Sequence, residues 1–504
     1  MKQFLKKHTF LLLCFLAAAV YLLFCSKSSP LYPMNDWVDV NCFYTMGKSV
    51  LAGQVPYRDL CEQKGPVLYF VYALVALFSP GSFFGVYLLE VLTYGLFLWY
   101  GGKILRLYLG DSPLVWFLML GLGALICVSG AFSHGASVEE MCLFMSAYGL
   151  FVVLRALREG RILSFREAFL CGVWCGFLLW IKYTMLGLYL GIAIFIVFWY
   201  LGQGFRWREL LRTIGAFFAG LGVVSAVVFL YFLIHGAFGD LFTVYFYNNI
   251  FLYVRDLEQS HLTTILNCMK STLRYNRVYS LLLIPGGIWA LIRGLRDIRI
   301  PGLLLLSFAG LALGTYWGGW NISYYGLVFA VFAVFGVLGI GEGLKLCRIQ
   351  RLFDGPGARR AVSLVLALLL ILGMGVFCRR EGKNTYLMAF EKEDLPQYRF
   401  AETIRQTPDA TLLNFGFLDG GFYFAADVVP HNRFFCILNV SAPDMWQSMY
   451  RQVNQGLTDY VVTRDRELGS YHVDASRYTC VDVAEFYFEG KTRTYYLYRL
   501  NTLS

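Results

Sequence analysis

The segment NDWVDVNCFYTMGKSVLAGQVPYRDLCEQKGP, residues 35–66, is the first polar interval after an apolar N-terminal run. Only 15% of the chain is charged, yet ionisable side chains are concentrated here. They include Asp36, Asp39, Arg58, Asp59, Glu62 and Lys64. Ionisable groups are costly to hold beside hydrocarbon and usually mark a functional site. If the flanking runs cross a membrane, we expect this segment to carry a site at one membrane face.

The composition is that of a membrane protein. The 504 residues are 58% hydrophobic and have a mean hydropathy of +0.56, which excludes an ordinary soluble globule. A net charge of +10 would suggest nucleic-acid binding in a soluble protein. Here the Lys and Arg residues lie in short clusters between apolar runs, so they indicate membrane orientation and no nucleic-acid partner is expected.

The 13 cysteines lie mostly inside apolar runs and show no metal-ligand spacing. We interpret them as small buried hydrophobic residues. No cofactor is expected, and metal dependence stays open.

Eleven apolar runs approach the length needed to cross about 30 Å of hydrocarbon. They lie near residues 9–25, 84–102, 112–131, 137–155, 166–181, 184–202, 209–235, 278–293, 300–316, 326–341 and 361–378. Lys2, Lys6 and Lys7 precede the first run and place the N-terminus in the cytoplasm. The end of that run, LLFCSKSS, lacks a small-x-small cleavage site, so we interpret it as an uncleaved membrane helix.

A twelfth run, 67–79, is too short to cross and is followed by Pro80 and Gly81. With this run as an interfacial helix on the outer face, the clusters of Lys and Arg at 103–106, 155–166, 206–212, 293–299 and 345–360 become cytoplasmic. The intervals 132–136, 182–183, 236–277 and 317–325 become external. The positive-inside rule therefore predicts a multi-pass cell-membrane protein with a cytoplasmic N-terminus and an extracytoplasmic C-terminal part.

From about residue 380 the charges become ordinary and the apolar runs shorten to strand length. We expect strands at 411–417, 433–440, 459–464, 480–488 and 492–500, and a helix at 441–456. The predicted fold is mostly α: a polytopic helical bundle over 1–378, with interfacial helices in its first external loop, 27–83, and a small extracytoplasmic α/β domain over 379–504.

With this topology, the polar residues that interrupt the apolar pattern converge on the external face. From the later loops they are His134, Glu139, Glu140, Lys182, Asn248, Asn249, Arg255, Asp256, Glu258, His261, Trp317, Trp320, Asn321, Tyr324 and Tyr325. Such a set suits an anionic lipid that carries a sugar. Cations would neutralise a phosphate, carboxylates would activate an acceptor, and aromatic faces would stack on sugar or prenyl carbons.

An acid after the first span, a helix ending in Gly, and the run PYRDLCEQKGPVLYF (56–70) resemble the type C membrane glycosyltransferases. More narrowly, the chain resembles glycosyltransferase family 39 and its bacterial relatives, which include protein O-mannosyltransferases and lipid A aminoarabinose transferases. The resemblance covers about residues 9–340. It implies inverting transfer of a sugar from a polyprenyl-phosphate donor to an acceptor hydroxyl or amine on the outer face, with an acid of the first loop as the base.

The resemblance also implies roles for first-loop residues. Asp39 matches the family's acid, but the family often has Asp-Glu there and this chain has Asp39-Val40, so Asp36 stays an alternative base. Lys64 matches a lysine that meets the donor phosphate. Arg58 and Asp59 are better explained as structural residues that pair with each other or with Glu62.

In the later loops, Glu139 or Glu140 matches a second-loop acid, and Lys182 matches a lysine after the fifth span. Arg255 would also offset phosphate charge. Asn249, Tyr324 and Tyr325 complete the expected substrate contacts.

Each candidate residue has a purely structural alternative. Asp36 would cap a helix at 39–52, and Asp39 would cap or form an ion pair. Lys64 and Lys182 would extend their ammonium groups to the membrane interface. Tyr324 and Tyr325 would belong to an interfacial aromatic belt.

Two other functions compete with sugar transfer. A transporter or flippase of a lipid-linked glycan usually has midplane charges and repeated halves, and neither pattern is present in this sequence. A non-catalytic envelope-assembly protein would leave the acids of several loops unexplained. The expected partners are a polyprenyl-phosphate sugar donor, membrane lipid, and an acceptor glycan, lipid or protein.

Overall fold

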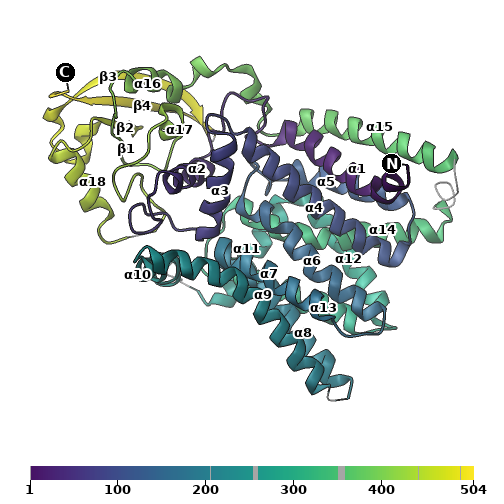
Figure 1. Ribbon diagram of the computed structural model, residues 1–504. Coiled ribbons are helices and arrows are strands. Elements are labelled where there is room, and N and C mark those ends of the chain that lie inside the picture. The colour runs from purple at the N-terminus through teal and green to yellow at the C-terminus, as the bar shows by residue number, and fades with distance from the viewer. Residues whose placement is uncertain are drawn as a thin grey trace. The chain divides into compact units, whose positions relative to one another are not determined.

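The computed structural model describes residues 2–204, 206–253, 259–349, 358–440, 442–488 and 490–503, and most of these residues are helical (Figure 1). The chain forms two compact units. The first comprises Met1–Ser26, Tyr87–Val227 and Asp256–Thr385, and the second comprises Lys27–Val86, Val228–Arg255 and Tyr386–Ser504. Three expected site residues, Arg255, Asp256 and Glu258, lie outside the described residues.

The longer helices follow the apolar runs. They are α1 (Lys2–Cys25), α4 (Phe84–Leu109), α5 (Leu114–Cys127), α6 (Val138–Arg158), α7 (Phe165–Lys182), α8 (Leu186–Gly202), α9 (Trp207–Ile234), α11 (His261–Tyr275), α12 (Arg277–Gly294), α13 (Arg299–Tyr316), α14 (Ala330–Leu346) and α15 (Ala358–Glu381). Between them lie α10 (Phe238–Asp240), a π-helical segment (Leu241–Leu252) and 3₁₀ segments at Tyr183–Met185 and Ser323–Phe329.

Eight helical segments are long and apolar enough to cross a membrane, counted over the described residues. The predicted count of eleven is not confirmed. The runs at 166–181 and 184–202 fall in one helical stretch, Phe165–Gly202, whose only break is at Lys182 (φ −154°, ψ 89°). The run at 112–131 contains the 14-residue helix α5, and α12 is not among the eight segments.

Glycines bring the helices of the first unit into backbone contact. A Cβ at Gly187 of α8 would lie 2.0 Å from the carbonyl oxygen of Gly310 in α13, and Gly191 and Gly314 extend this contact by one turn. A Cβ at Gly172 of α7 would lie 1.9 Å from Phe217 O. Small residues with this spacing permit close packing where no water-driven force holds helices together. Elsewhere in this unit, α1 lies beside α15 (Figure 1).

The second unit contains a four-stranded sheet, ordered β1 (Leu412–Asn414), β2 (Tyr460–Arg464), β4 (Lys491–Leu500), β3 (Tyr478–Phe488). β1 is parallel to β2, and the other pairs are antiparallel. Its helices are α2 (Val38–Leu51), α3 (Pro66–Phe78), α16 (Pro396–Ile404), α17 (Phe422–Ala426) and α18 (Met445–Asn454), with 3₁₀ turns at Thr385–Ala389, Lys392–Asp394, Leu468–Tyr471 and Ala475–Arg477.

Four predicted strands and the helix within 441–456 are confirmed, but the strand expected at 433–440 is wrong. The backbone of this segment bonds to loops instead of a sheet ladder. Cys61 N donates to Arg433 O (2.8 Å), and Ile437 N donates to Phe417 O (3.1 Å). The apolar side chains are buried, as in a strand, but no neighbouring strand pairs with their backbone.

Helix α2 is joined to the C-terminal part of this unit by side-chain contacts. The Thr45 hydroxyl donates to buried Asp419 (2.6 Å), and Lys48 forms an ion pair with Asp427. The Sγ atoms of Cys42 and Cys436 are 3.9 Å apart. The helix therefore packs against residues that follow it in the chain by 374 to 394 positions.

Helix α3 confirms a short helix at 67–79 and packs closely on α2. A Cβ at Gly47 would lie 2.5 Å from the carbonyl carbon of Tyr72, so the two backbones touch. With 13 residues, α3 is too short to cross. Its placement on the outer membrane surface stays a prediction.

Candidate functional site

Asp36 is held in a buried ion pair. Its Oδ1 lies 2.5 Å from Lys27 Nζ, and the two side chains are 1% and 2% exposed. Asp36 does not cap α2: the residue before the helix is Trp37, whose N–H donates to Asn35 Oδ1 (3.0 Å). A carboxylate already bound to a buried lysine is poorly placed to accept a proton from a substrate.

Asp39 differs from Asp36 in position and exposure. It lies in the first turn of α2 and is half-buried. The N-terminal end of a helix stabilises a carboxylate through the helix dipole. Of the two candidate bases, Asp39 is therefore the more accessible.

The backbone around Lys64 is fixed by four hydrogen bonds. The hydroxyls of Tyr57 and Tyr69 both donate to Lys64 O, at 2.5 and 2.9 Å. Lys64 N donates to Glu62 Oε2 (2.8 Å), and Asn249 Nδ2 donates to Gln63 O (2.7 Å). Asn249, which the sequence predicts as a substrate contact, thus bonds to the protein backbone in this structure.

The Lys64 ammonium lies 3.8 Å from Glu62 Oε1 and 5.6 Å from the ring centroid of Phe43. Its side chain is 15% exposed. The cation therefore sits on a rigid backbone, next to one carboxylate.

The expected Arg58–Asp59 pair is confirmed. Two bonds of 2.8 Å join the guanidinium to the carboxylate, and Arg58 also donates to His235 O (2.7 Å). The hydrogen bond from Arg58 lowers the pKa of Asp59. Asp59 also accepts a hydrogen bond from Val55 N (2.7 Å), so the Arg58–Asp59 pair holds the loop backbone in place.

Three predicted external loops meet in the first unit. Lys182 forms a buried ion pair with Glu139, and its ammonium lies 4.0 Å from the ring centroid of Tyr325 and 5.8 Å from that of Tyr324. The sequence predicts that these residues share the external face, but it does not indicate their individual contacts. Lys182 is a buried, charge-compensated cation on an aromatic surface.

Glu140 is 1% exposed and interacts with the Glu90 side chain and the Ala136 backbone. A second buried acid, Glu90, accepts from Ser26 Oγ and from Ala136 N, both at 2.6 Å. Sequence reasoning missed Glu90 because it lies within an apolar run. A single acid inside such a run was the available signal.

No group of three or more His, Cys, Asp or Glu side chains could hold a metal ion, within the residues searched, which are those the structure describes. The surroundings of Lys64 and those of Lys182 each contain a carboxylate, a lysine and an aromatic ring. Chemically, they can accept a proton, bind an anion and contact a sugar or prenyl surface.

Two crystal structures of ArnT from Cupriavidus metallidurans are similar to this chain. The structure in the apo state has a TM-score of 0.57 at 14% sequence identity, covering 96% of this chain and 97% of that one. The chain has the fold of ArnT. The structure of ArnT bound to undecaprenyl phosphate also gives a TM-score of 0.57 at 14% identity, covering 98% of both chains.

The ArnT-like fold over nearly the whole length confirms the expected architecture, with a mostly helical part and a small sheet-containing part. It does not assign the chain to family 39. No family model matches the sequence, and no curated protein matches it.

Proposed function

We propose that this chain transfers a sugar from a polyprenyl-phosphate donor to a hydroxyl or amine of a glycan, lipid or protein on the outer face of the membrane. The observation that carries the proposal is the ArnT-like fold, which extends over both units, together with an ArnT structure bound to undecaprenyl phosphate. The N-terminus would be cytoplasmic and residues 379–504 extracytoplasmic.

Asp39 would be the general base. The acceptor oxygen or nitrogen attacks the anomeric carbon from the face opposite the phosphate, and Asp39 takes its proton. The sugar–phosphate bond breaks, the anomeric centre inverts, and polyprenyl phosphate leaves. General base catalysis of this kind contributes about 10²–10⁴-fold. Half-buried Asp39 is favoured over Asp36 because Asp36 is neutralised by Lys27.

Lys64 would bind the donor phosphate and stabilise the charge that develops on it. Its backbone is already fixed by Tyr57, Tyr69 and Glu62, so little reorganisation is needed as charge moves. Asn249 would act as a positioning residue through Gln63 O. Arg255 remains a proposed second cation.

In the other unit, Lys182 would act through its ion pair with Glu139. A donor phosphate would compete with the Glu139 carboxylate for the ammonium, while Tyr324 and Tyr325 offer ring faces to sugar or prenyl carbons. Glu140 would be the alternative to Glu139 as the second-loop acid. The meeting of these residues with Asp39 and Lys64 in one cavity stays a prediction.

The test compares envelope glycans, glycolipids and glycoproteins by mass spectrometry in cells that lack the protein and are complemented with variants. We expect wild type and Asp111→Asn to restore a sugar-bearing product and Asp39→Asn to restore at most about 1% of it, from the 10²-fold lower bound for a base. Asp111 is a matched control because its side chain is 64% exposed and its partners are Arg106 and Arg360.

Wild-type product levels with Asp39→Asn would refute the base assignment. If no glycan, glycolipid or glycoprotein depended on the protein, the transferase proposal itself would fail.

A further inference from the structure

Two cavities adjoin in the first unit, and Leu163 and Thr213 line both. One is an apolar groove of about 330 Å³ between α7, α8 and α9. It is lined by side chains including Cys171, Ile192, Ala193, Val197, Ile214 and Phe218. The other is a polar pocket of about 600 Å³, formed by the loop between α6 and α7 and the first turns of α9.

The apolar groove opens onto an exposed hydrophobic surface. Ile194, Val197 and Phe218 are 39%, 36% and 61% exposed. Because this protein has apolar helices long enough to cross a bilayer, its apolar groove is suited to bind the hydrocarbon tail of a lipid. The polar pocket beside it would then lie at headgroup level.

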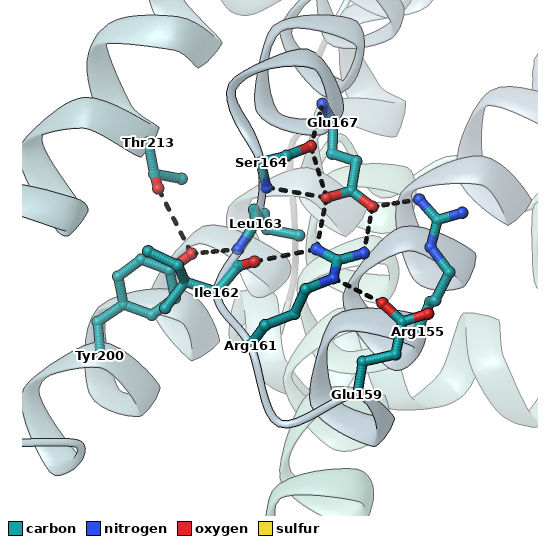
Figure 2. A network of polar contacts seen from close by, with 9 residues as sticks. All are labelled: Arg155, Glu159, Arg161, Ile162, Leu163, Ser164, Glu167, Tyr200 and Thr213. Carbon is teal, nitrogen blue, oxygen red and sulfur yellow. Dashed lines mark hydrogen bonds and ion pairs between the residues drawn. The ribbon is translucent and has the colours of Figure 1, made fainter.

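Four of the charges in the polar pocket neutralise one another (Figure 2). Arg161 binds both oxygens of Glu167, at 2.7 and 2.9 Å, and its Nε donates to Glu159 (2.6 Å). Arg155 also donates to Glu167, whose carboxylate forms a capping box with Ser164 at the start of α7. This network shapes the pocket and leaves it with no net charge.

Two further charged residues line the pocket, Glu209 and Arg212, three residues apart in the first turns of α9. Neither forms an ion pair among the residues that the structure describes. The pocket therefore presents one carboxylate and one guanidinium side by side, next to a groove for an apolar chain. A complementary ligand carries an anion and a cation a few atoms apart, on a hydrocarbon tail.

We propose that this site binds a bilayer phospholipid with an aminoethyl phosphate headgroup. The phosphate pairs with Arg212, the primary ammonium pairs with Glu209, and one acyl chain lies along α8 and α9. A polyprenyl phosphate or a purely anionic phospholipid would leave Glu209 facing a phosphate without a cation. The site uses residues that the proposed sugar transfer does not need, so it stands independently of that function.

The test uses the full-length protein in nanodiscs made from equal parts of phosphatidylethanolamine, phosphatidylglycerol and phosphatidylcholine. Lipids retained on mild detergent extraction are counted by native mass spectrometry. We expect phosphatidylethanolamine to be retained at least threefold over its share of the bilayer. Arg212→Gln should reduce retention to the bulk share, and Glu209→Gln should remove the preference over phosphatidylglycerol. Arg208→Gln, a neighbouring exposed residue outside the pocket, should change nothing.

Folding of the variants is verified by their unfolding temperatures, and the exposed positions of Arg212 and Arg208 favour unchanged values. Ala193→Trp, which fills the groove, should lower retention of every lipid. Equal retention of the three lipids in wild type would overturn the proposal. It would also fail if added undecaprenyl phosphate displaced phosphatidylethanolamine at equimolar amounts, or if a second copy of the chain occupied the groove and no lipid were retained.

Discussion

The buried ion pair between Lys27 and Asp36 offers a way to separate the two candidate bases. Breaking the pair by Asp36→Leu leaves a lysine that is 2% exposed without a partner. Loss of one member of a buried pair typically costs about 3–5 kcal/mol. We expect Asp36→Leu to lose stability in that range and to lose activity with it, so the single variant alone says nothing about catalysis.

The double variant Lys27→Met/Asp36→Leu removes both charges, and each replacement keeps the branching pattern of the heavy atoms near the backbone. Replacement of a buried pair by apolar residues is often neutral or stabilising by about 1–4 kcal/mol. The gain is favoured here because Asp36 Oδ2 is buried without a hydrogen-bond partner among the described residues. We therefore expect the double variant to recover wild-type stability or exceed it.

Thermal unfolding in detergent measures the stability, and sugar transfer to the envelope product measures the activity. If Asp39 is the base, the double variant is stable and active. A double variant that is stable but inactive would make Asp36 the base. A loss below about 1 kcal/mol in Asp36→Leu, the range of an exposed pair, would refute the burial argument itself.

Three further predictions concern separate parts of the molecule. Lys64→Met should lower transfer by about 10²–10³-fold, and Lys64→Arg, which keeps a cation beside Glu62, should restore part of it if the side chain binds phosphate. Burial raises the pKa of Asp419 from 3.8 to about 6, so its contribution to stability is full below about pH 3.8 and is lost as the pH rises through about 6, by about 3 kcal/mol. Asp419→Asn should flatten that slope in unfolding measured against pH. Gly187→Val should separate α8 from α13 and lower the unfolding temperature, whereas Gly202→Val, with open space around its Cα, should not.

Periodicity and charge allowed much of the fold to be predicted. Helix α3 and the strands at 460–464, 478–488 and 491–500 lie where the sequence indicates them. The strand at 433–440 was wrong because its apolar residues signal burial, and burial is also reached by an irregular segment whose backbone bonds to loops. The predicted span count is not confirmed where helices are shorter than their apolar runs, as for α5.

In the candidate site, too, some contacts were predictable from the sequence and others were not. Arg58 and Asp59 are neighbours in sequence, so their pairing was predictable. Tyr57 and Tyr69 were within the quoted motif, but nothing in its spacing indicates that both hydroxyls reach one carbonyl oxygen. The contact of Ser26 with Glu90 spans 64 residues and leaves no periodic signal. Long-range polar contacts depend on packing that a linear pattern does not encode.

The attachment of α2 to the C-terminal part of its unit has a consequence during synthesis. Thr45 and its partner Asp419 are 374 residues apart. At roughly 5–20 residues per second, the ribosome needs about 20–75 s to make that intervening chain. Throughout that delay, the helix that begins beside Asp39 is already translated while Asp419, Asp427 and Cys436 do not yet exist. The nascent protein must therefore keep α2 soluble, or covered by a chaperone or by lipid, until the last quarter of the chain emerges and the unit can close.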